Sequence, residues 1–284
     1  MAPKIMNDMR TASLPPVAFI GGGNMARSLI GGLVGGGGDA ASIRVAEPVA
    51  ELRDALQRDF GARVFAEAGQ AAPGAGVWVL AVKPQVMRTV CEALAATAQA
   101  ERPLVVSIAA GITGTQIARW LGGGIAVVRC MPNTPALLGA GVTGLHANAE
   151  VDAGQRASAE TLLASAGATV WVENEALMDA VTAVSGSGPA YVFLLAEAMQ
   201  AAGEAEGLSA EAARALTIQT LLGAARMLTH DDTPAAELRR RVTSPNGTTQ
   251  AALESFEHDG FRAIVARAIH AARARGAELA AAHD

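Results

Sequence analysis

Short β-branched apolar runs alternate with helical stretches over residues 17–172 of this 284-residue chain. Most of the runs are continuously apolar rather than alternating in polarity, which is typical of strands that are covered on both faces. Their alternation with helices predicts βαβ units and a parallel sheet. The predicted strands are residues 17–20, 43–46, 77–82, 104–108 and 126–130, and the weaker runs 143–145 and 169–172 are candidates for edge strands.

The β signal stops at about residue 173, and the remainder is expected to be entirely helical. We therefore expect an α/β fold: an N-terminal Rossmann-like, doubly wound dinucleotide-binding domain over residues 14–173, after a flexible leader of residues 1–13. An all-helical substrate and dimerisation domain is expected over residues 174–284. Its predicted helices are residues 189–203, a helix capped by Ser209, a short helix that starts at residues 233–234, and residues 250–258 and 261–275.

Composition excludes several classes of protein. Hydrophobic residues make up 51% and charged residues 17% of the chain, which argues against intrinsic disorder. A net charge of −5 gives no bulk attraction to nucleic acid. The first 16 residues have no apolar core, and apolar stretches elsewhere are interrupted, so we expect neither a signal peptide nor a membrane span, and a cytoplasmic protein. The isolated Cys91 and Cys130 and the scattered histidines predict neither a disulfide framework nor a metal site.

A glycine-rich turn follows the first predicted strand and leads into a helix. It reads Gly21, Gly22, Gly23, Asn24, Met25, Ala26, the pattern G-x-G-x-x-A. The first glycine permits a tight turn, the second lets the backbone approach a diphosphate, and the alanine allows the helix to pack closely on the strand. The helix N-terminus offers N–H groups and a positive dipole to the phosphates. Such a pattern alone also fits a plain flexible turn, but its place in a βαβ unit predicts a dinucleotide site.

An acidic residue, Glu47, ends the second predicted strand. A carboxylate there can accept hydrogen bonds from a ribose 2′-hydroxyl and disfavours a 2′-phosphate, so Glu47 favours NADH over NADPH. Arg44 and Arg53 are close enough in sequence to weaken that preference. The alternative is that Glu47 is only a solvated loop residue.

Two further strand ends are candidate cofactor contacts, because ligands of open α/β sheets bind at the carboxyl ends of the strands. Lys83 is one of only two lysines in the chain, although a solvated loop lysine would look the same. The small residues after the next strand suit backbone contact with a flat nicotinamide, or simply close packing. The predicted contacts are Ala81, Val82, Lys83, Pro84, Ile108, Ala109 and Ala110.

Three loop motifs suggest a substrate side. Residues 129–135 end another predicted strand and carry two prolines, while residues 185–189 and 244–249 each precede a predicted helix. Backbone N–H groups at a helix N-terminus can receive a carboxylate. Each motif alone also fits turn chemistry and capping. These two pre-helical motifs contain Ser185, Gly186, Ser187, Gly188, Pro189, Ser244, Gly247, Thr248 and Thr249.

These motifs together resemble the pyrroline-5-carboxylate reductase family. The resemblance rests on residues 19–26, 81–85, 129–135, 180–193 and 238–250. By matching position, it implies that residues 21–26, 81–84 and 108–110 contact the dinucleotide and that residues 185–189, 244, 248 and 249 lie around the substrate. It implies a Rossmann domain followed by helices that interleave in a homodimer, often assembled into a decamer, with the active site between the nucleotide domain and the helices. It also implies reduction of 1-pyrroline-5-carboxylate to L-proline by NADPH or NADH, the last step of proline biosynthesis. Where Glu47 stands, the family often has a Ser, Asn or Arg-type residue for the 2′-phosphate.

The expected reaction is hydride transfer from nicotinamide C4 to the imine carbon. Protonation of the imine nitrogen makes that carbon more electrophilic, so a strong enzymic base is unnecessary, in accord with substrate loops that contain no His or Lys. Thr249 is the catalytic candidate, as a hydrogen-bond partner of the ring nitrogen, although its hydroxyl could equally be a helix N-cap. The backbone near Gly247 and Thr248 is expected to hold the carboxylate.

Two other classes fit parts of the chain. A β-hydroxyacid dehydrogenase also has a Rossmann domain followed by helices, but it uses a lysine on the helix after a glycine-rich loop. The helix predicted after Pro189 contains no lysine. A non-enzymatic nucleotide sensor would not need a loop such as residues 244–249.

Overall fold

The computed structural model describes residues 14–230 and 232–281, so the predicted leader of residues 1–13 lies outside the described part of the chain. The described chain forms two compact units. The sheet unit contains residues 14–187 and the last turns of the chain, residues 272–281, and the helical unit contains residues 188–271. This grouping differs from the sequence-based boundary at residue 173, because residues 174–187 and the end of the last helix pack with the sheet.

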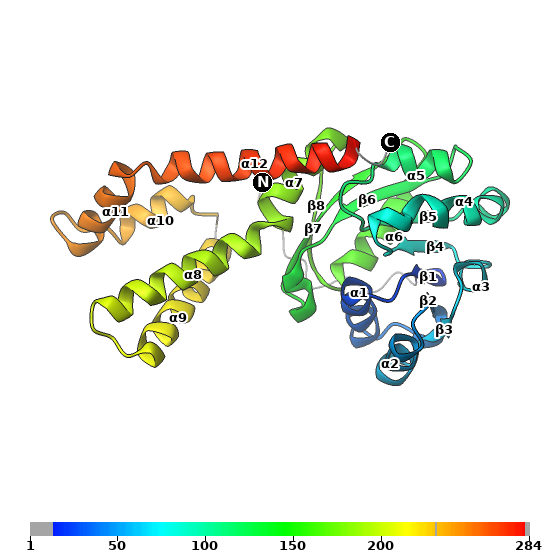
Figure 1. Ribbon diagram of the computed structural model, residues 1–284, viewed down its shortest axis with the longest axis horizontal. Helices are drawn as coiled ribbons and strands as arrows, with labels where there is room; N and C mark the ends of the chain where they lie inside the picture. The colour runs from blue at the N-terminus through cyan, green and yellow to red at the C-terminus, as the bar shows by residue number, and fades with distance from the viewer. Residues whose placement is uncertain (1–13, 231, 282–284) are drawn as a thin grey trace. The chain divides into compact units, whose positions relative to one another are not determined.

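The sheet unit is built on an eight-stranded sheet with the strand order β3-β2-β1-β4-β5-β6-β7-β8 (Figure 1). Neighbouring strands are parallel, except that β6 and β7 are antiparallel. This is the predicted doubly wound parallel sheet. The strands are β1 (Val17–Ile20), β2 (Ile43–Ala46), β3 (Arg63–Phe65), β4 (Val77–Leu80), β5 (Leu104–Ser107), β6 (Val127–Met131), β7 (Gly141–Ala147) and β8 (Gly167–Trp171).

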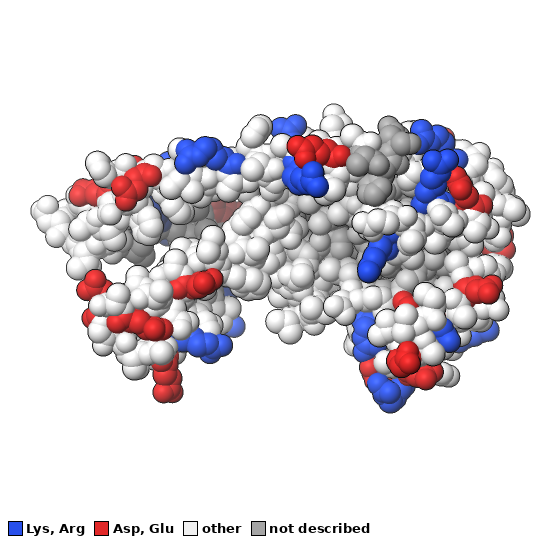
Figure 2. All heavy atoms as spheres, viewed as in Figure 1, with Lys and Arg blue, Asp and Glu red and all other residues white. Residues whose placement is uncertain are grey.

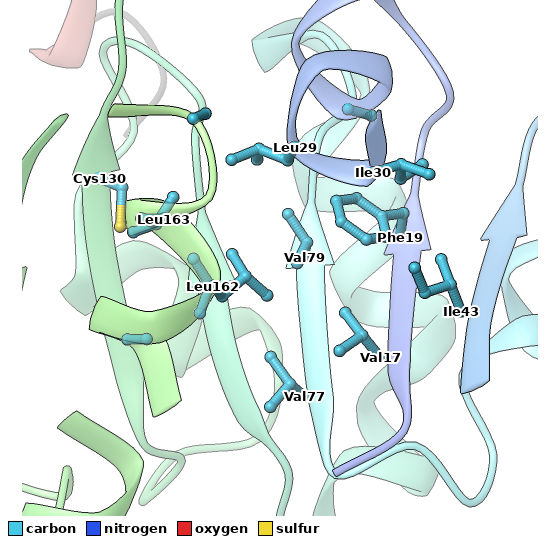
Figure 3. Packing of buried hydrophobic residues seen from close by; sticks show 14 of the residues in the cluster. Val17, Phe19, Leu29, Ile30, Ile43, Val77, Val79, Cys130, Leu162 and Leu163 are labelled. Atoms are coloured by element: carbon cyan, nitrogen blue, oxygen red, sulfur yellow. The ribbon is translucent and has the colours of Figure 1, made fainter. Parts of the chain in front are cut away.

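Helices cover both faces of the sheet, as its fully buried strands require. Val17 and Phe19 of β1 belong to one hydrophobic core, which also contains Leu29 and Ile30 of the first helix (Figure 3). The residues between them, such as Ala18, belong to a second core on the opposite face. The first core takes residues from α1 (Asn24–Gly35), α2 (Ala50–Phe60) and α6 (Ala153–Ala164), and the second from α3 (Ala68–Ala71), α4 (Pro84–Glu101) and α5 (Gly114–Trp120).

Both cysteines lie in these cores. Burial raises the pKa of Cys91 to about 12 and raises the pKa of Cys130 as well. Because the thiolate is the reactive and metal-binding form, burial disfavours both nucleophilic attack and metal binding by these two side chains.

The helical unit contains α8 (Gly188–Ala205), α9 (Ala210–His230), α10 (Ala235–Arg241), α11 (Thr248–His258) and the first turns of α12 (Phe261–Ala281). The Ser209 hydroxyl accepts a hydrogen bond from the Ala212 N–H, as predicted for an N-cap. Large apolar side chains on α8 and α9 are exposed, among them Phe193, Leu194 and Leu216. Such a surface is typical of a subunit interface.

Acidic and basic side chains are interspersed over the face of the molecule shown in Figure 2. Within residues 14–230 and 232–281, no helix is long and apolar enough to cross a membrane.

Candidate active site

The glycine turn at the end of β1 is held in place by both neighbouring strands. The Gly21 N–H donates to the Ala46 carbonyl at 2.8 Å, and the Ala81 N–H donates to the Ile20 carbonyl at 2.8 Å. Gly21 has φ +107°, and a Cβ atom there would lie 2.7 Å from the Ala81 carbonyl oxygen. Glycine is therefore required at position 21 both for its backbone conformation and for its lack of a side chain.

Helix α1 begins directly after this turn, with Gly23 as its N-cap and without a side-chain cap. A Cβ atom built on Gly23 would meet nothing within 4 Å, whereas Ala26 is buried against the sheet. Gly23 and Asn24 are exposed. The first turn of α1 thus presents its N–H groups and the positive end of its dipole to open space, which fits a diphosphate.

Glu47 braces the glycine turn. Its side chain is 7% exposed, and its two carboxylate oxygens accept hydrogen bonds from the Gly22 N–H at 2.9 Å and the Val49 N–H at 3.0 Å. The alternative interpretation of Glu47 as a solvated loop residue is therefore wrong. Arg53 donates to the backbone carbonyl oxygens of Glu47 and Pro48, at 2.7 and 2.8 Å, so its guanidinium is held at the end of β2 beside Glu47.

The predicted cofactor residues after β4 and β5 lie along the same edge of the sheet. The Ile108 N–H donates to the Leu80 carbonyl at 3.2 Å, which continues the pairing past the strand ends. Lys83 is exposed and is the N-cap of α4, where Pro84 takes the first helical position. Ala109 is buried and Ala110 exposed.

These strand ends meet where the order of strands reverses. From β1 the chain adds β2 and β3 on one side and β4 and β5 on the other. Open α/β sheets bind their ligands at the carboxyl ends of the strands at such a switch point. The structure thus brings together the glycine turn, Glu47 and the segments after β4 and β5, at the place expected for a dinucleotide.

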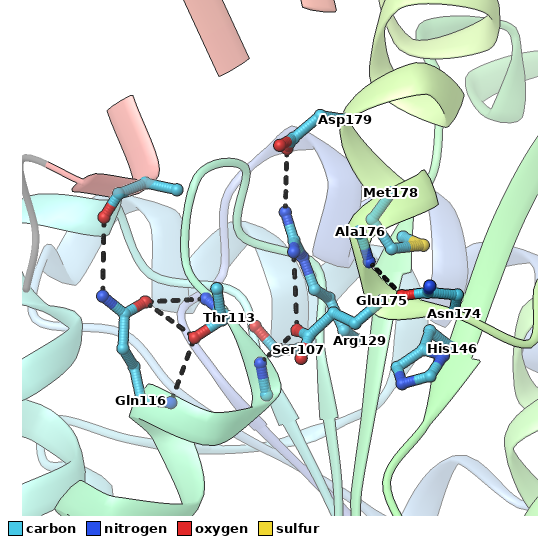
Figure 4. Close-up of polar contacts among 12 residues, drawn as sticks. Ser107, Thr113, Gln116, Arg129, His146, Asn174, Glu175, Ala176, Met178 and Asp179 are labelled. Atoms are coloured by element: carbon cyan, nitrogen blue, oxygen red, sulfur yellow. Dashed lines mark hydrogen bonds and ion pairs between the residues drawn. The ribbon is translucent and has the colours of Figure 1, made fainter. Parts of the chain in front are cut away.

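A buried arginine connects the sheet to the segment that precedes the helical unit (Figure 4). Arg129 of β6 is 5% exposed, and its guanidinium nitrogens lie 3.4 Å from carboxylate oxygens of both Glu175 and Asp179. Glu175 also accepts a hydrogen bond from the Gly114 N–H at 2.6 Å. Asp179 lies in α7 (Met178–Val181), so β6, the start of α5 and α7 meet at this cluster.

The prediction of a glycine-rich loop at residues 185–187 is wrong. Helix α7 continues into a π-helical turn, η4 (Thr182–Gly186), and the Ser187 N–H donates to the Thr182 carbonyl at 2.8 Å. The Ser185 hydroxyl donates to the Val181 carbonyl at 2.9 Å. The Ser187 N–H and the Ser185 hydroxyl therefore both donate to backbone carbonyl oxygens of the preceding helical turn. Single π-helical turns within helices occur frequently at functional sites.

The other predicted substrate residues belong to the helical unit. Gly188 and Pro189 begin α8. Gly247 is the N-cap of α11 and donates its N–H to the Ser244 carbonyl at 3.1 Å, while Ser244, Thr248 and Thr249 are exposed. Thr249 is the second residue of α11, and no side chain caps this helix. The alternative that Thr249 is an N-cap is thus wrong, since Gly247 holds that position.

Two polar residues of this region were absent from the sequence-based set of site residues. Arg129 and Asn133 stood in the motif of residues 129–135, but only the fold shows that they contact residues about 50 positions later. Within the described residues, no group of three or more His, Cys, Asp or Glu side chains is placed to hold a metal ion.

The doubly wound sheet and the glycine turn at its switch point define a dinucleotide-dependent oxidoreductase of the Rossmann type. A family model described as NADP oxidoreductase, coenzyme F420-dependent, matches residues 16–111, and one described as pyrroline-5-carboxylate reductase dimerisation matches residues 175–279. The pyrroline-5-carboxylate reductases of Pseudomonas aeruginosa and Vibrio alginolyticus are 55% and 44% identical to the chain. They cover 94% and 93% of it, and 98% and 97% of their own lengths.

Solved structures agree with these relatives. The pyrroline-5-carboxylate reductase of Coxiella burnetii is 42% identical, with a TM-score of 0.91 over 94% of this chain and 98% of that one. The Plasmodium falciparum enzyme, solved with NADP bound, is 27% identical, with a TM-score of 0.83 over 94% of this chain and 99% of that one. The chain belongs to the pyrroline-5-carboxylate reductase family.

Proposed function

We propose that this chain reduces 1-pyrroline-5-carboxylate to L-proline, the last step of proline biosynthesis, with NADPH or NADH as the cofactor. The observation that carries the proposal is a dinucleotide-type glycine turn in a chain that matches a pyrroline-5-carboxylate reductase at 55% identity over nearly its full length. Spectrophotometric assay of NAD(P)H oxidation with the cyclic imine tests it. Failure to reduce the imine with NADPH and also with NADH would contradict the proposal.

The residues of the sheet unit bind and orient the cofactor in this proposal. The first turn of α1 receives the diphosphate, Glu47 lies at the adenine ribose, and residues 81–84 and 108–110 contact the rest of the dinucleotide. The bound nicotinamide supplies the hydride. The protein contributes mainly position, because the electrophile is activated by protonation of its own nitrogen.

The substrate is assigned to the two small-residue segments. Residues 185–189 lie around it, Ser244 contributes a hydroxyl, and the backbone at Gly247 and Thr248 receives the carboxylate at the N-terminus of α11, where the helix dipole favours an anion. The exposed hydroxyl of Thr249 forms a hydrogen bond to the ring nitrogen.

Replacement of Thr249 by alanine is expected to lower kcat/KM for the imine by about tenfold to a hundredfold, because a hydrogen bond to a charged group is worth about 1.5–3 kcal/mol. The KM for the cofactor should stay within about twofold of wild type. Thr249→Ser keeps the hydroxyl and should restore most of the activity. Steady-state kinetics with each substrate varied separately measure this, and an unchanged kcat/KM in Thr249→Ala removes Thr249 from the site.

Glu47 is expected to set the preference between the two cofactors. Glu47→Gln removes the negative charge and keeps an amide oxygen that can accept from the Gly22 N–H, while the bond from the Val49 N–H is lost. A carboxylate and a phosphate a few ångströms apart repel each other by more than 1 kcal/mol, so this change should raise the ratio of kcat/KM for NADPH to that for NADH about tenfold. Arg88→Gln, which removes a charge on the exposed surface of α4, is the matched control. An unchanged ratio would exclude Glu47 from the ribose site.

The proposal includes the assembly and the location. The family model over residues 175–279 and the exposed apolar side chains of α8 and α9 support a homodimer formed through the helices, which can assemble further into a decamer. Sedimentation velocity distinguishes these states. We place the enzyme in the cytoplasm, and we assign nucleotide binding to residues 14–173 and substrate binding and dimerisation to residues 174–284.

A further inference from the structure

The π-helical turn η4 (Thr182–Gly186) is closely followed by α8, whose second residue is Pro189. If the chain continued past η4 as an α-helix, the Ser185 carbonyl would accept from the backbone N–H four residues later, which is position 189. That residue is Pro189, which has no N–H. Ser185 is partly buried, and a carbonyl shielded from water costs free energy unless another donor replaces the missing one.

Asn133 supplies such a donor. Its Nδ2 donates to the Ser185 carbonyl at 3.1 Å, while its Oδ1 accepts from the Val142 N–H at 2.9 Å. Asn133 is 9% exposed and directly follows Pro132 at the end of β6. One side-chain amide therefore joins the end of β6, the start of β7 and the turn η4.

Other close contacts fix the same turn against the sheet. A Cβ atom on Gly186 would lie 2.6 Å from the Met131 side chain, so Met131 packs directly on the turn. Gly144 of β7 lies directly against Val181 at the end of α7, with no room for a Cβ atom. These two contacts are apolar packing. The Asn133 amide, in contrast, forms a hydrogen bond with one backbone atom of the turn, the Ser185 carbonyl oxygen.

We propose that Asn133 is a positioning residue for the reductase: its amide takes the place of the N–H that Pro189 lacks and thereby holds residues 185–187 in the conformation that receives the imine. This inference rests on the proposed function. Asn133 acts through the turn and does not itself contact the reacting atoms.

Asn133→Asp tests the inference with a side chain of the same shape. The carboxylate can still accept from the Val142 N–H, but it places an acceptor against the Ser185 carbonyl. We expect kcat/KM for the imine to fall at least tenfold, mostly through a higher KM for the imine. Both kcat and the KM for the cofactor should stay within twofold of wild type.

Asn148 provides a matched control in the same unit. Its Oδ1 accepts from the Val127 N–H at 3.0 Å and its Nδ2 donates to the Ile125 carbonyl at 2.9 Å, so it makes the same two kinds of bond at the other end of β6. Asn148→Asp should lower Tm to a similar extent and leave kcat/KM of the folded enzyme near wild type. Equal losses of activity in both variants, or no loss in Asn133→Asp, would overturn the inference.

A double-mutant cycle adds a second measurement. Pro189→Ala restores a backbone N–H at position 189, so the loss caused by Asn133→Asp should be several-fold smaller in that background. Strictly additive effects would contradict the proposed replacement. If Asn133→Asp does not fold, Asn133→Ser takes its place in the cycle, because a smaller polar side chain fits the same space. The wild-type rate with the imine tests the proposed function separately, since it does not depend on any of these variants.

Discussion

Replacement of Gly21 by alanine is expected to lower kcat/KM for the cofactor by more than a hundredfold. Gly21 has φ +107°, a conformation that alanine adopts only with strain, and the new methyl group would lie 2.7 Å from the Ala81 carbonyl oxygen. The turn must then move away from β4, and the start of α1 moves with it. Titration calorimetry with NADPH and with NADH, together with steady-state kinetics, measures the effect.

Gly35→Ala is the control for this variant. Gly35 lies in the last turn of α1, and a Cβ atom there would meet nothing within 4 Å. This change should leave cofactor affinity as in wild type and should leave stability unchanged or slightly increased. A Gly21→Ala protein that binds either cofactor with wild-type affinity would show that the turn does not form the cofactor site.

Replacement of Arg129 by methionine is expected to lower the free energy of unfolding by about 3–5 kcal/mol. Arg129 is buried between Glu175 and Asp179, and without it two largely buried carboxylates face each other with no cation. Urea denaturation of the purified chain measures the change. The control is Arg88→Met, because Arg88 and Glu92 form an exposed pair on α4, and its loss should cost under about 1 kcal/mol. Equal small effects of the two changes would mean that the Arg129 cluster does not hold α7 to the sheet.

The fold could be predicted largely because its signal is local. The first four strands predicted from apolar runs coincide with β1, β2, β4 and β5 to within two residues. Strand β3 was missed because it has only three residues, one of them Arg63, and lies at the edge of the sheet. Strands β7 and β8 are longer than predicted, because pairing with neighbours extends them through glycines that carry no β signal of their own.

The candidate site could be predicted only where its chemistry is contained in one short segment. The glycine turn is such a segment, since its spacing reflects the geometry of a single strand–turn–helix unit. The bond from Gly22 to Glu47 joins positions 25 apart, and that from Asn133 to Ser185 joins positions 52 apart, so both depend on how the sheet is assembled. The π-helical turn at residues 182–186 also escaped prediction, because glycine and serine between two helices indicate a loop by local preference.

The most direct test of the account follows the hydride itself. Reduced cofactor that carries deuterium at the transferable nicotinamide C4 position is incubated with the enzyme and 1-pyrroline-5-carboxylate, and the product is examined by proton NMR and mass spectrometry. We predict proline with one deuterium, on the ring carbon that was doubly bonded to nitrogen. Proline without deuterium, or no consumption of cofactor in the presence of the imine, would contradict the account.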